Sequence, residues 1–356
     1  MKIAIFSENY KPQINGVVER ICMYEEYWKL DGHQVDIYTI TSSPGTEKLS
    51  YIGCQDWFGY KTKDNAPVFG IGYLSLEQMV KVINKSYDII WIVLGLSYPL
   101  LCQLPLAKLG SGTRVICSLH IDIHNYIKLY KPEMIELMKI CMDIFHMTIE
   151  NVADLFITPN SHILKQLGEI TTSTAIFPTG VDKRVFYPKA NTRKKNWIIY
   201  AGRLAIEKNL KSLENIFDLL KNYKLLIFGD GPLREELEQR WKDKPVKFMG
   251  SVSKIKLASY YRRAKLTIQP SLSETFGFTI LESLACGTPC VYRGTPVMLS
   301  IFRSFGPHLT LSASETLDRD DLKKISFLLQ DSRNHHYDIP DWSEAAKKTL
   351  EIFSNK

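Results

Sequence analysis

Several common sequence signals are missing from this chain of 356 residues. Its seven cysteines form no C-x-x-C pair, and no group of His, Cys, Asp and Glu has the spacing of a metal site. The chain also lacks a phosphate loop of the form G-x-x-x-x-G-K-[ST] and a nucleophile elbow. We therefore expect no disulfide framework and no bound metal. An odd, scattered set of thiols is typical of a reducing, cytoplasmic setting.

Long uninterrupted apolar runs are scarce as well. The apolar run near the start of the chain ends at Ser7, so the first residues do not read as a signal peptide. The stretch 89–107 carries no charge, but a glycine and two prolines interrupt it. We expect a buried strand over Ile89–Leu94 rather than a transmembrane helix, because a strand buried on both faces is also a continuous apolar run.

Positive charge is unevenly distributed along the chain. The formal net charge is +7, with −3 in residues 1–180 and +10 in residues 181–356. A basic half favours a phosphate-bearing ligand, a membrane surface or a nucleic acid. Since no run interleaves basic and aromatic residues and no nucleic-acid module is present, we expect no nucleic-acid partner.

Strand and helix patterns alternate from the first residues onward. The apolar run KIAIF predicts a strand, and the residues Val17, Ile21, Tyr24 and Trp28 recur on one face of a following helix. The segment VDIYTI then predicts a second strand, which completes a βαβ unit with a parallel sheet. Further strands are expected at DIIWIVL, TRVICSLH and DLFITPN, with a long helix over 132–153.

A second series of the same kind follows a segment of different character. Residues 176–196 contain Pro, Gly and basic residues without a long apolar period, and we interpret them as a linker. Beyond it, NWIIYAGR, KLLIFGDG, VKFMG and KLTIQPS predict strands, and the residues Leu210, Leu213, Phe217 and Leu220 predict one face of a helix. This pattern favours two doubly wound domains, whose ligands bind beyond the carboxyl ends of the strands and between the domains.

The stretch SETFGFTILE contains two glutamates eight positions apart. That spacing places Glu274 in a loop and Glu282 within a helix, with Ser273 or Thr275 as the cap. Gly277 allows another group to approach the backbone, and a helix start is suited to phosphate. The stretch thus predicts either a ligand site or a capping glutamate beside a solvated one.

Cations and glycines follow other predicted strands. Arg203 and Lys208 in GRLAIEKNL could hold a diphosphate or be two surface cations. The G-x-G of GDGPLRE reads as a strand-to-helix turn, because no third glycine follows. Gly16, at the start of the first helix, either lets a ligand approach the backbone or is an ordinary loop glycine. His120 ends a predicted strand and is either structural or at a site.

Together these motifs resemble those of the retaining glycosyltransferases of family 4. The resemblance runs from IFSENYKPQINGVVERI through SLHID, PTGVDKRVFYP and GRLAIEKNL to ETFGFTILESLACGTP, with its E-x7-E pair. It implies an α/β protein of the GT-B fold, with two Rossmann-like doubly wound domains that face an interdomain cleft. The N-terminal, acceptor-side domain would span 1–178 and about 341–356, where a C-terminal helix crosses back to it. The donor-binding domain would span 179–340.

The resemblance also implies roles for individual residues. Glu274 would lie beside the donor sugar, and Arg203 and Lys208 would neutralise the diphosphate leaving group. His120 would lie near the C6 hydroxyl of the sugar, and Glu282 would take the ribose hydroxyls. The residues whose loop or backbone N–H groups would face the donor are Gly16, Phe276, Gly277, Phe278 and Thr279.

The implied reaction is transfer of a hexose from a UDP- or GDP-linked donor, with retention, to a glycan or lipid hydroxyl in α-linkage and without a metal cofactor. A catalytically silent binding protein and a sugar-nucleotide epimerase of the same fold remain alternatives. A lipid acceptor, with peripheral contact at the cytosolic face of a membrane, stays open through Lys128 and Lys131. After Val291 the sequence reads YRGTPVMLSIFRSFG, where the family carries a glycine pair and a Glu.

Overall fold

The fold is that of a computed structural model, which describes residues 1–41, 43–53, 70–94, 112–120, 122, 128, 133, 136, 147–166, 168, 170–306, 309–331 and 335–355. The chain divides into two compact units. Unit 1 comprises Met1–Thr179 and Trp342–Lys356, and unit 2 comprises Gly180–Asp341.

Unit 1 is built on a seven-stranded parallel sheet in the order β3-β2-β1-β6-β7-β8-β9. The strands are β1 (Lys2–Ser7), β2 (Gln34–Thr39), β3 (Thr46–Lys48), β6 (Ile89–Leu94), β7 (Arg114–Leu119), β8 (Leu155–Thr158) and β9 (Thr174–Ile176). A separate antiparallel pair joins β4 (Ser50–Gly53) and β5 (Gly70–Tyr73). The helices are α1 (Gly16–Leu30), α2 (Leu76–Lys85), α6 (Ser161–Gln166) and α12 (Trp342–Ser354).

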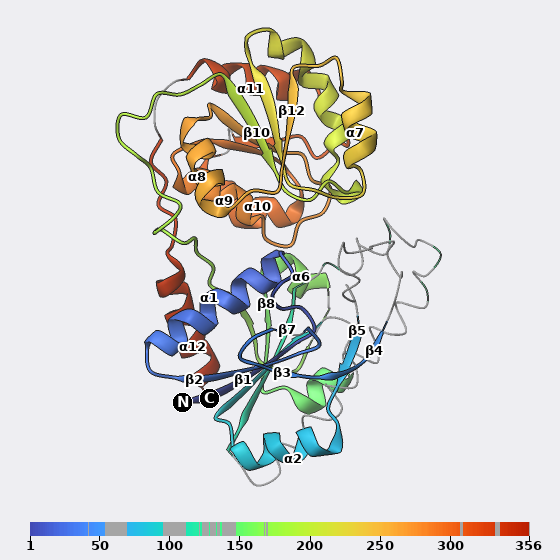
Figure 1. The fold of residues 1–356 in the computed structure, drawn as a ribbon, viewed down its shortest axis with the longest axis vertical. Helices are drawn as coiled ribbons and strands as arrows, with labels where there is room; N and C mark the ends of the chain where they lie inside the picture. The colour runs from blue at the N-terminus through green and yellow to red at the C-terminus, as the bar shows by residue number, and fades with distance from the viewer. Residues whose placement is uncertain are drawn as a thin grey trace. The chain divides into compact units, whose positions relative to one another are not determined.

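Helices α1 and α12 pack side by side on unit 1, so both chain ends lie close together (Figure 1). Aromatic rings hold them there, because Tyr24 of α1 contacts Trp342 of α12 with ring centroids 5.6 Å apart. The indole N–H of Trp28 donates to the carbonyl of Ala346 at 2.9 Å. Packing of this kind stabilises by about 1 kcal/mol per aromatic pair beyond the burial of area. The C-terminal helix thus belongs to unit 1, as the resemblance predicted.

Unit 2 is built on a six-stranded parallel sheet in the order β12-β11-β10-β13-β14-β15. The strands are β10 (Trp197–Ala201), β11 (Lys224–Phe228), β12 (Val246–Gly250), β13 (Leu266–Gln269), β14 (Cys290–Arg293) and β15 (Thr310–Leu311). The α-helices are α7 (Arg234–Arg240), α8 (Lys254–Arg263), α9 (Phe278–Ala285), α10 (Pro296–Phe302) and α11 (Arg319–Gln330). The 3-10 helices are η3 (Ile206–Lys208), η4 (Leu210–Asn222) and η5 (Arg303–Phe305).

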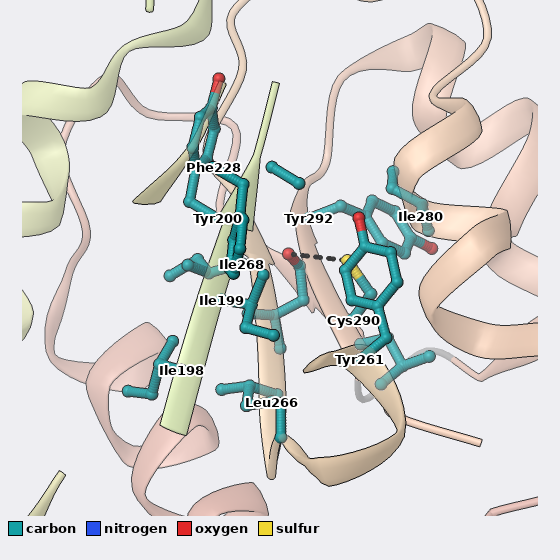
Figure 2. Packing of buried hydrophobic residues seen from close by; sticks show 14 of the residues in the cluster. Ile198, Ile199, Tyr200, Phe228, Tyr261, Leu266, Ile268, Ile280, Cys290 and Tyr292 are labelled. Carbon is teal, nitrogen blue, oxygen red and sulfur yellow. Dashed lines mark hydrogen bonds between the residues drawn. The ribbon is translucent and has the colours of Figure 1, made fainter. Parts of the chain in front are cut away.

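Helices flank the strands of unit 2, with α7 on one side and α8 and α9 on the other (Figure 1). Figure 2 shows the core between the strands and α8 and α9, where Ile199, Ile268, Tyr261, Ile280 and Cys290 are buried. Their apolar burial supplies the main stabilisation of the unit. The predicted fold class, two doubly wound α/β domains, is confirmed.

The predicted helix over 210–220 is present, as the 3-10 helix η4. Leu210, Leu213 and Leu220 are buried and Phe217 packs against the same core, while the fully buried Ile216 was not predicted. One detail of the sequence interpretation was wrong. The predicted linker is partly core, since the side chains of Val181 and Phe186 are buried in unit 2. Single apolar residues in an irregular loop leave no periodic signal.

The apolar stretch 89–107 begins with the predicted strand, β6. Its remainder and most of the predicted helix over 132–153 lie outside the described residues. In the part of the chain that the structure describes, no helix has both the length and the apolarity needed to cross a membrane.

Candidate functional site

The candidate site forms where two loops of unit 2 leave neighbouring strands. Strands β10 and β13 are parallel and adjacent, so their carboxyl ends meet at one edge of the sheet. The loop after β10 leads through Arg203 to Lys208, and the loop after β13 leads through Glu274 to the start of α9. The sheet therefore brings together residues that lie far apart in the sequence.

Lys208 and Glu274 form an ion pair at this edge. The Nζ atom of Lys208 lies 2.6 Å from Oε1 of Glu274, with both side chains mostly buried. The hydroxyl of Ser271 donates to the same carboxylate oxygen at 2.9 Å. A partly buried charge-assisted pair of this length is stronger than a surface ion pair.

Arg203 is held by a second carboxylate on its own loop. Its guanidinium lies 2.5 Å from the carboxylate of Glu207, whose side chain is 3% exposed. The backbone carbonyl of Glu207 accepts from the N–H of Leu272 at 2.8 Å, so it also joins the two loops. Glu207 was not predicted from the sequence, because Arg203 lies in the loop before η3 and the i,i+4 rule for helices does not apply to this pair.

The start of α9 contradicts the predicted capping. Its N-cap is Gly277, which has φ 82, so neither Ser273 nor Thr275 is the N-cap residue. A Cβ at Gly277 would lie 3.1 Å from the ring of Phe302 and 3.4 Å from Sδ of Met298. Gly277 is therefore required both by its left-handed backbone and by the packing of α10 against the helix start.

The two glutamates of the E-x7-E pair lie as predicted, with Glu274 in the loop and Glu282 within α9. Glu282 is buried, and Nζ of Lys254 lies 4.0 Å from its carboxylate. The hydroxyl of Thr279 accepts from the side-chain amide of Gln269 at 2.7 Å.

The aromatic residues on either side of Gly277 contact each other. Phe276 is buried, and its ring centroid lies 5.1 Å from that of Phe278. Phe276 also packs against Phe302 of α10, at 6.3 Å between centroids. The segment after Val291, which departs from the family pattern, thus contributes α10 as an apolar support for the helix start.

Gly16 and His120 lie in unit 1. Gly16 is the first residue of α1, where the side chain of Asn15 accepts from the N–H groups of Val17 and Val18, both at 3.0 Å. His120 is buried after β7, with its Nε2 atom 2.9 Å from the hydroxyl of Ser118. Burial, aided by the charge of Arg20, holds the pKa of His120 well below its usual value, so the ring is neutral at pH 7.

Part of the basic excess of the second half lies away from this site. At the amino ends of the strands of unit 2, Lys195 lies 4.6 Å and Arg263 5.7 Å from the ring of Trp197. Lys265, before β13, lies 5.9 Å from the ring of Tyr223. These cations sit at the opposite edge of the sheet from Lys208, so a nucleotide bound at the candidate site does not explain them.

Comparison with known proteins bears on this geometry. Residues 183–348 match the family model of glycosyl transferases group 1. The matched segment contains both loops of the candidate site and the start of α9.

Solved structures show the fold. Sucrose-phosphate synthase from Thermosynechococcus elongatus aligns with a TM-score of 0.69 and 20% identity over 99% of this chain and 95% of that one. HepE of Anabaena, in complex with UDP and glucose, aligns with a TM-score of 0.67 and 15% identity over 99% of each chain. The chain has the GT-B fold.

Curated relatives are similar in sequence as well. The sulfoquinovosyl transferase of Arabidopsis thaliana is 29% identical over 53% of this chain, and the chain spans 39% of that protein's length. The alpha-monoglucosyldiacylglycerol synthase of Streptococcus pneumoniae is 25% identical over 84% of this chain and 72% of its own length.

No cluster of three or more His, Cys, Asp and Glu suited to a metal ion occurs among the described residues. Lys128 is exposed, and Lys131 falls outside the described part of the chain.

Proposed function

We propose that this protein is a retaining glycosyltransferase that moves a hexose from a UDP- or GDP-linked donor to a hydroxyl of a glycan or lipid, with α-linkage. The observation that carries the proposal is the gathering of Arg203, Lys208 and the Glu274 loop beside the start of α9. These groups lie within the segment that matches glycosyl transferases group 1.

The chemistry of the donor explains why these residue types would be needed. As the glycosidic bond to the nucleotide breaks, negative charge grows on the diphosphate. Fixed cations and a helix start stabilise charge where it develops, which is the basis of electrostatic catalysis. Lys208 has three N–H donors, so it can bind a phosphate oxygen while it still holds Glu274. In this mechanism the protein's own cations take the place of a metal.

In this proposal Glu274 and Glu282 contact the two parts of the donor that carry hydroxyl groups, the sugar and the ribose. Glu274 lies beside the sugar and Glu282 accepts from the ribose, while N–H groups of Phe276, Gly277 and Phe278 face the sugar and phosphate. The roles of Gly16 and His120, which lie in unit 1, are proposed from the sequence resemblance alone. Retention by attack on the face of the leaving group requires no protein nucleophile, in contrast to a double displacement.

Ligand-induced stabilisation tests the donor class. Thermal unfolding with UDP, GDP, ADP and their sugars should show a rise in melting temperature for UDP or GDP, because a ligand of the native state adds stability by mass action.

A silent binding protein would bind the nucleotide sugar without turnover. An epimerase would release an epimer without an acceptor, so product analysis separates all three functions.

A lipid acceptor is favoured by one face of α2. Leu76, Val80 and Ile83 follow the i, i+4, i+7 pattern, and their side chains are 78%, 49% and 38% exposed. Lys81 and Lys85 lie on the other side of this short helix, where they pair with Glu77 at 3.1 Å and Asp36 at 3.0 Å. An exposed apolar helix face of this kind is suited to peripheral contact with a membrane surface.

Vesicle flotation distinguishes the two acceptor classes. With vesicles containing anionic lipid at low salt, the wild type should float, and the double substitution Leu76→Glu, Val80→Glu should abolish flotation. Phe327→Glu is the matched control, because this residue of α11 is 69% exposed but lies in unit 2. If the wild type does not bind the vesicles at low salt, the lipid acceptor is ruled out and the glycan acceptor is the one that stands.

A further inference from the structure

Arg293 is a buried cation that the reaction described above does not use. It is the last residue of β14, and its side chain is 1% exposed. Burying a guanidinium costs several kcal/mol unless its N–H groups are bonded, and apolar residues of similar size are often at least as stabilising. Stability of the fold alone is therefore a poor reason for an arginine at this position.

Two backbone carbonyls accept from the Arg293 side chain. Its Nε atom donates to the carbonyl of Pro270 at 2.8 Å, and its Nη2 atom donates to the carbonyl of Glu315 at 3.0 Å. Strand β14 lies next to β13, with Tyr292 opposite Gln269, so the end of β14 is placed beside Pro270. The guanidinium thus joins two segments at the carboxyl edge of the sheet.

Each of these carbonyls leads to one member of the Lys208–Glu274 pair. Pro270 precedes Ser271, whose hydroxyl donates to the carboxylate of Glu274 at 2.9 Å. The carbonyl of Glu315 also accepts from the side-chain amide of Asn209 at 2.7 Å. Asn209 directly follows Lys208 and has a left-handed backbone with φ 49, which fixes the direction of the chain after Lys208.

We propose that Arg293 is a positioning residue. By donating to the carbonyls of Pro270 and Glu315, it fixes the two loops and so sets the separation of Lys208 and Glu274. This inference rests on the proposed function, because Lys208 and Glu274 are its donor-binding pair. Lysine cannot replace Arg293, since a single ammonium lacks the planar fork that reaches both carbonyls in a fixed geometry.

Arg293→Lys tests the proposal, with Arg262→Lys as a matched control. Arg262 also donates to two backbone carbonyls, those of Val185 at 3.1 Å and Tyr187 at 3.4 Å, but it lies in α8, away from the two loops. We expect Arg293→Lys to lower kcat for transfer by about tenfold or more, with a smaller change in the KM for donor, because misplacement of reacting groups is expensive. Arg262→Lys should retain the wild-type kcat.

A purely structural role is separated by a double-mutant cycle with Lys208→Ala. If Arg293 acts through Lys208, its substitution in the Lys208→Ala background should lower kcat by less than about threefold, because coupled residues are not additive. Hydrogen exchange gives a second readout that does not depend on turnover. Amides of 203–209 and 271–277 should exchange faster in Arg293→Lys and not in Arg262→Lys.

Each outcome bears on a different claim. Wild-type kcat in Arg293→Lys, or an equal loss in both backgrounds, would overturn the role of Arg293 and leave the proposed function intact. A wild type without donor binding or transfer would remove both. If Arg293→Lys fails to fold, Asn209→Ala breaks the same bridge from its other end and should lower kcat in the same way; unchanged kcat there would also overturn the role.

Discussion

Lys208 and Glu274 are 66 residues apart in sequence, yet Nζ of one lies 2.6 Å from Oε1 of the other. The pair exists because β10 and β13 are neighbours in the sheet, although β11 and β12 separate them along the chain. It joins the cation expected at the diphosphate to the carboxylate expected at the sugar. A ligand that binds one of these residues therefore changes the electrostatic environment of the other.

Loss of either member of this pair should reduce transfer strongly. We expect Lys208→Ala and Glu274→Ala each to lower kcat/KM by about 100-fold or more, since a single electrostatic group in a catalytic site is typically worth about 3 kcal/mol. Steady-state kinetics with the donor identified by thermal shift would measure this.

Lys211→Ala is the matched control for Lys208→Ala. Lys211 forms a 2.6 Å pair with Glu236, but both side chains are about half exposed. Its loss should leave transfer unchanged and alter the free energy of unfolding by less than about 1 kcal/mol. Unchanged nucleotide-sugar turnover in both Lys208→Ala and Glu274→Ala would remove the proposed roles.

Glu207 should matter for nucleotide affinity through Arg203. Replacing the buried carboxylate by an amide in Glu207→Gln removes the charge of this partner, so the guanidinium of Arg203 is held less firmly. We expect the Kd for the nucleoside diphosphate, measured by calorimetry, to rise by about tenfold, the equivalent of about 1.4 kcal/mol. Glu238→Gln is the control, because Glu238 pairs with Arg234 at 2.9 Å on the exposed surface of α7. Equal affinities in the two variants would contradict the role of Glu207.

Gly229 should tolerate no side chain. A Cβ at this position would lie 2.0 Å from the carbonyl oxygen of Gly202, just before Arg203, and its φ is +116. We expect Gly229→Ala to lower the free energy of unfolding of unit 2 by about 3 kcal/mol, through overpacking and backbone strain together. Gly32→Ala isolates the strain, because Gly32 has φ +84 with no atom within 4 Å of its Cβ position, and it should cost about 1 kcal/mol. Denaturant titration of both variants would show no difference if close approach were unimportant.

His120 should make the protein sensitive to acid. Its native pKa lies well below the ordinary 6.5, so below pH 6.5 the unfolded chain takes up a proton that the native ring does not. The free energy of unfolding should then fall with decreasing pH, by up to about 1.4 kcal/mol per pH unit from this residue. His120→Asn removes the contribution, so the stability difference between wild type and variant should shift in favour of the variant from pH 7 to pH 5. Parallel stability curves across that range would show that the native His120 takes up protons normally.

The fold was predictable because the signals that specify it are local and repeated. The apolar runs at Ile3–Phe6 and Ile198–Ala201 are buried strands, and the helix face containing Ile21, Tyr24 and Trp28 packs as its period indicated. The helix type of η4 was harder to predict. Over one short helix, apolar residues that repeat every three positions look much like residues that repeat every 3.6.

The contents of the candidate site were predictable and its construction was not. Arg203, Lys208, Glu274 and Gly277 follow strands and stand out by residue type. The supporting residues do not: Arg293, Asn209 and Ser271 lie in different segments, and the bonds that unite them pass through backbone carbonyls. A bond to a carbonyl leaves no trace in the identity of the residue that accepts it.

By itself, the amino-acid sequence determined the alternation of strands and helices, the two-domain class and the residue types at the carboxyl edge of unit 2, because periodicity and turn chemistry are properties of neighbouring residues. Tertiary structure alone decided which loops meet. The order of the strands places β13 beside β10, and that adjacency brings the carboxylate of Glu274 to Lys208 and the guanidinium of Arg293 behind them.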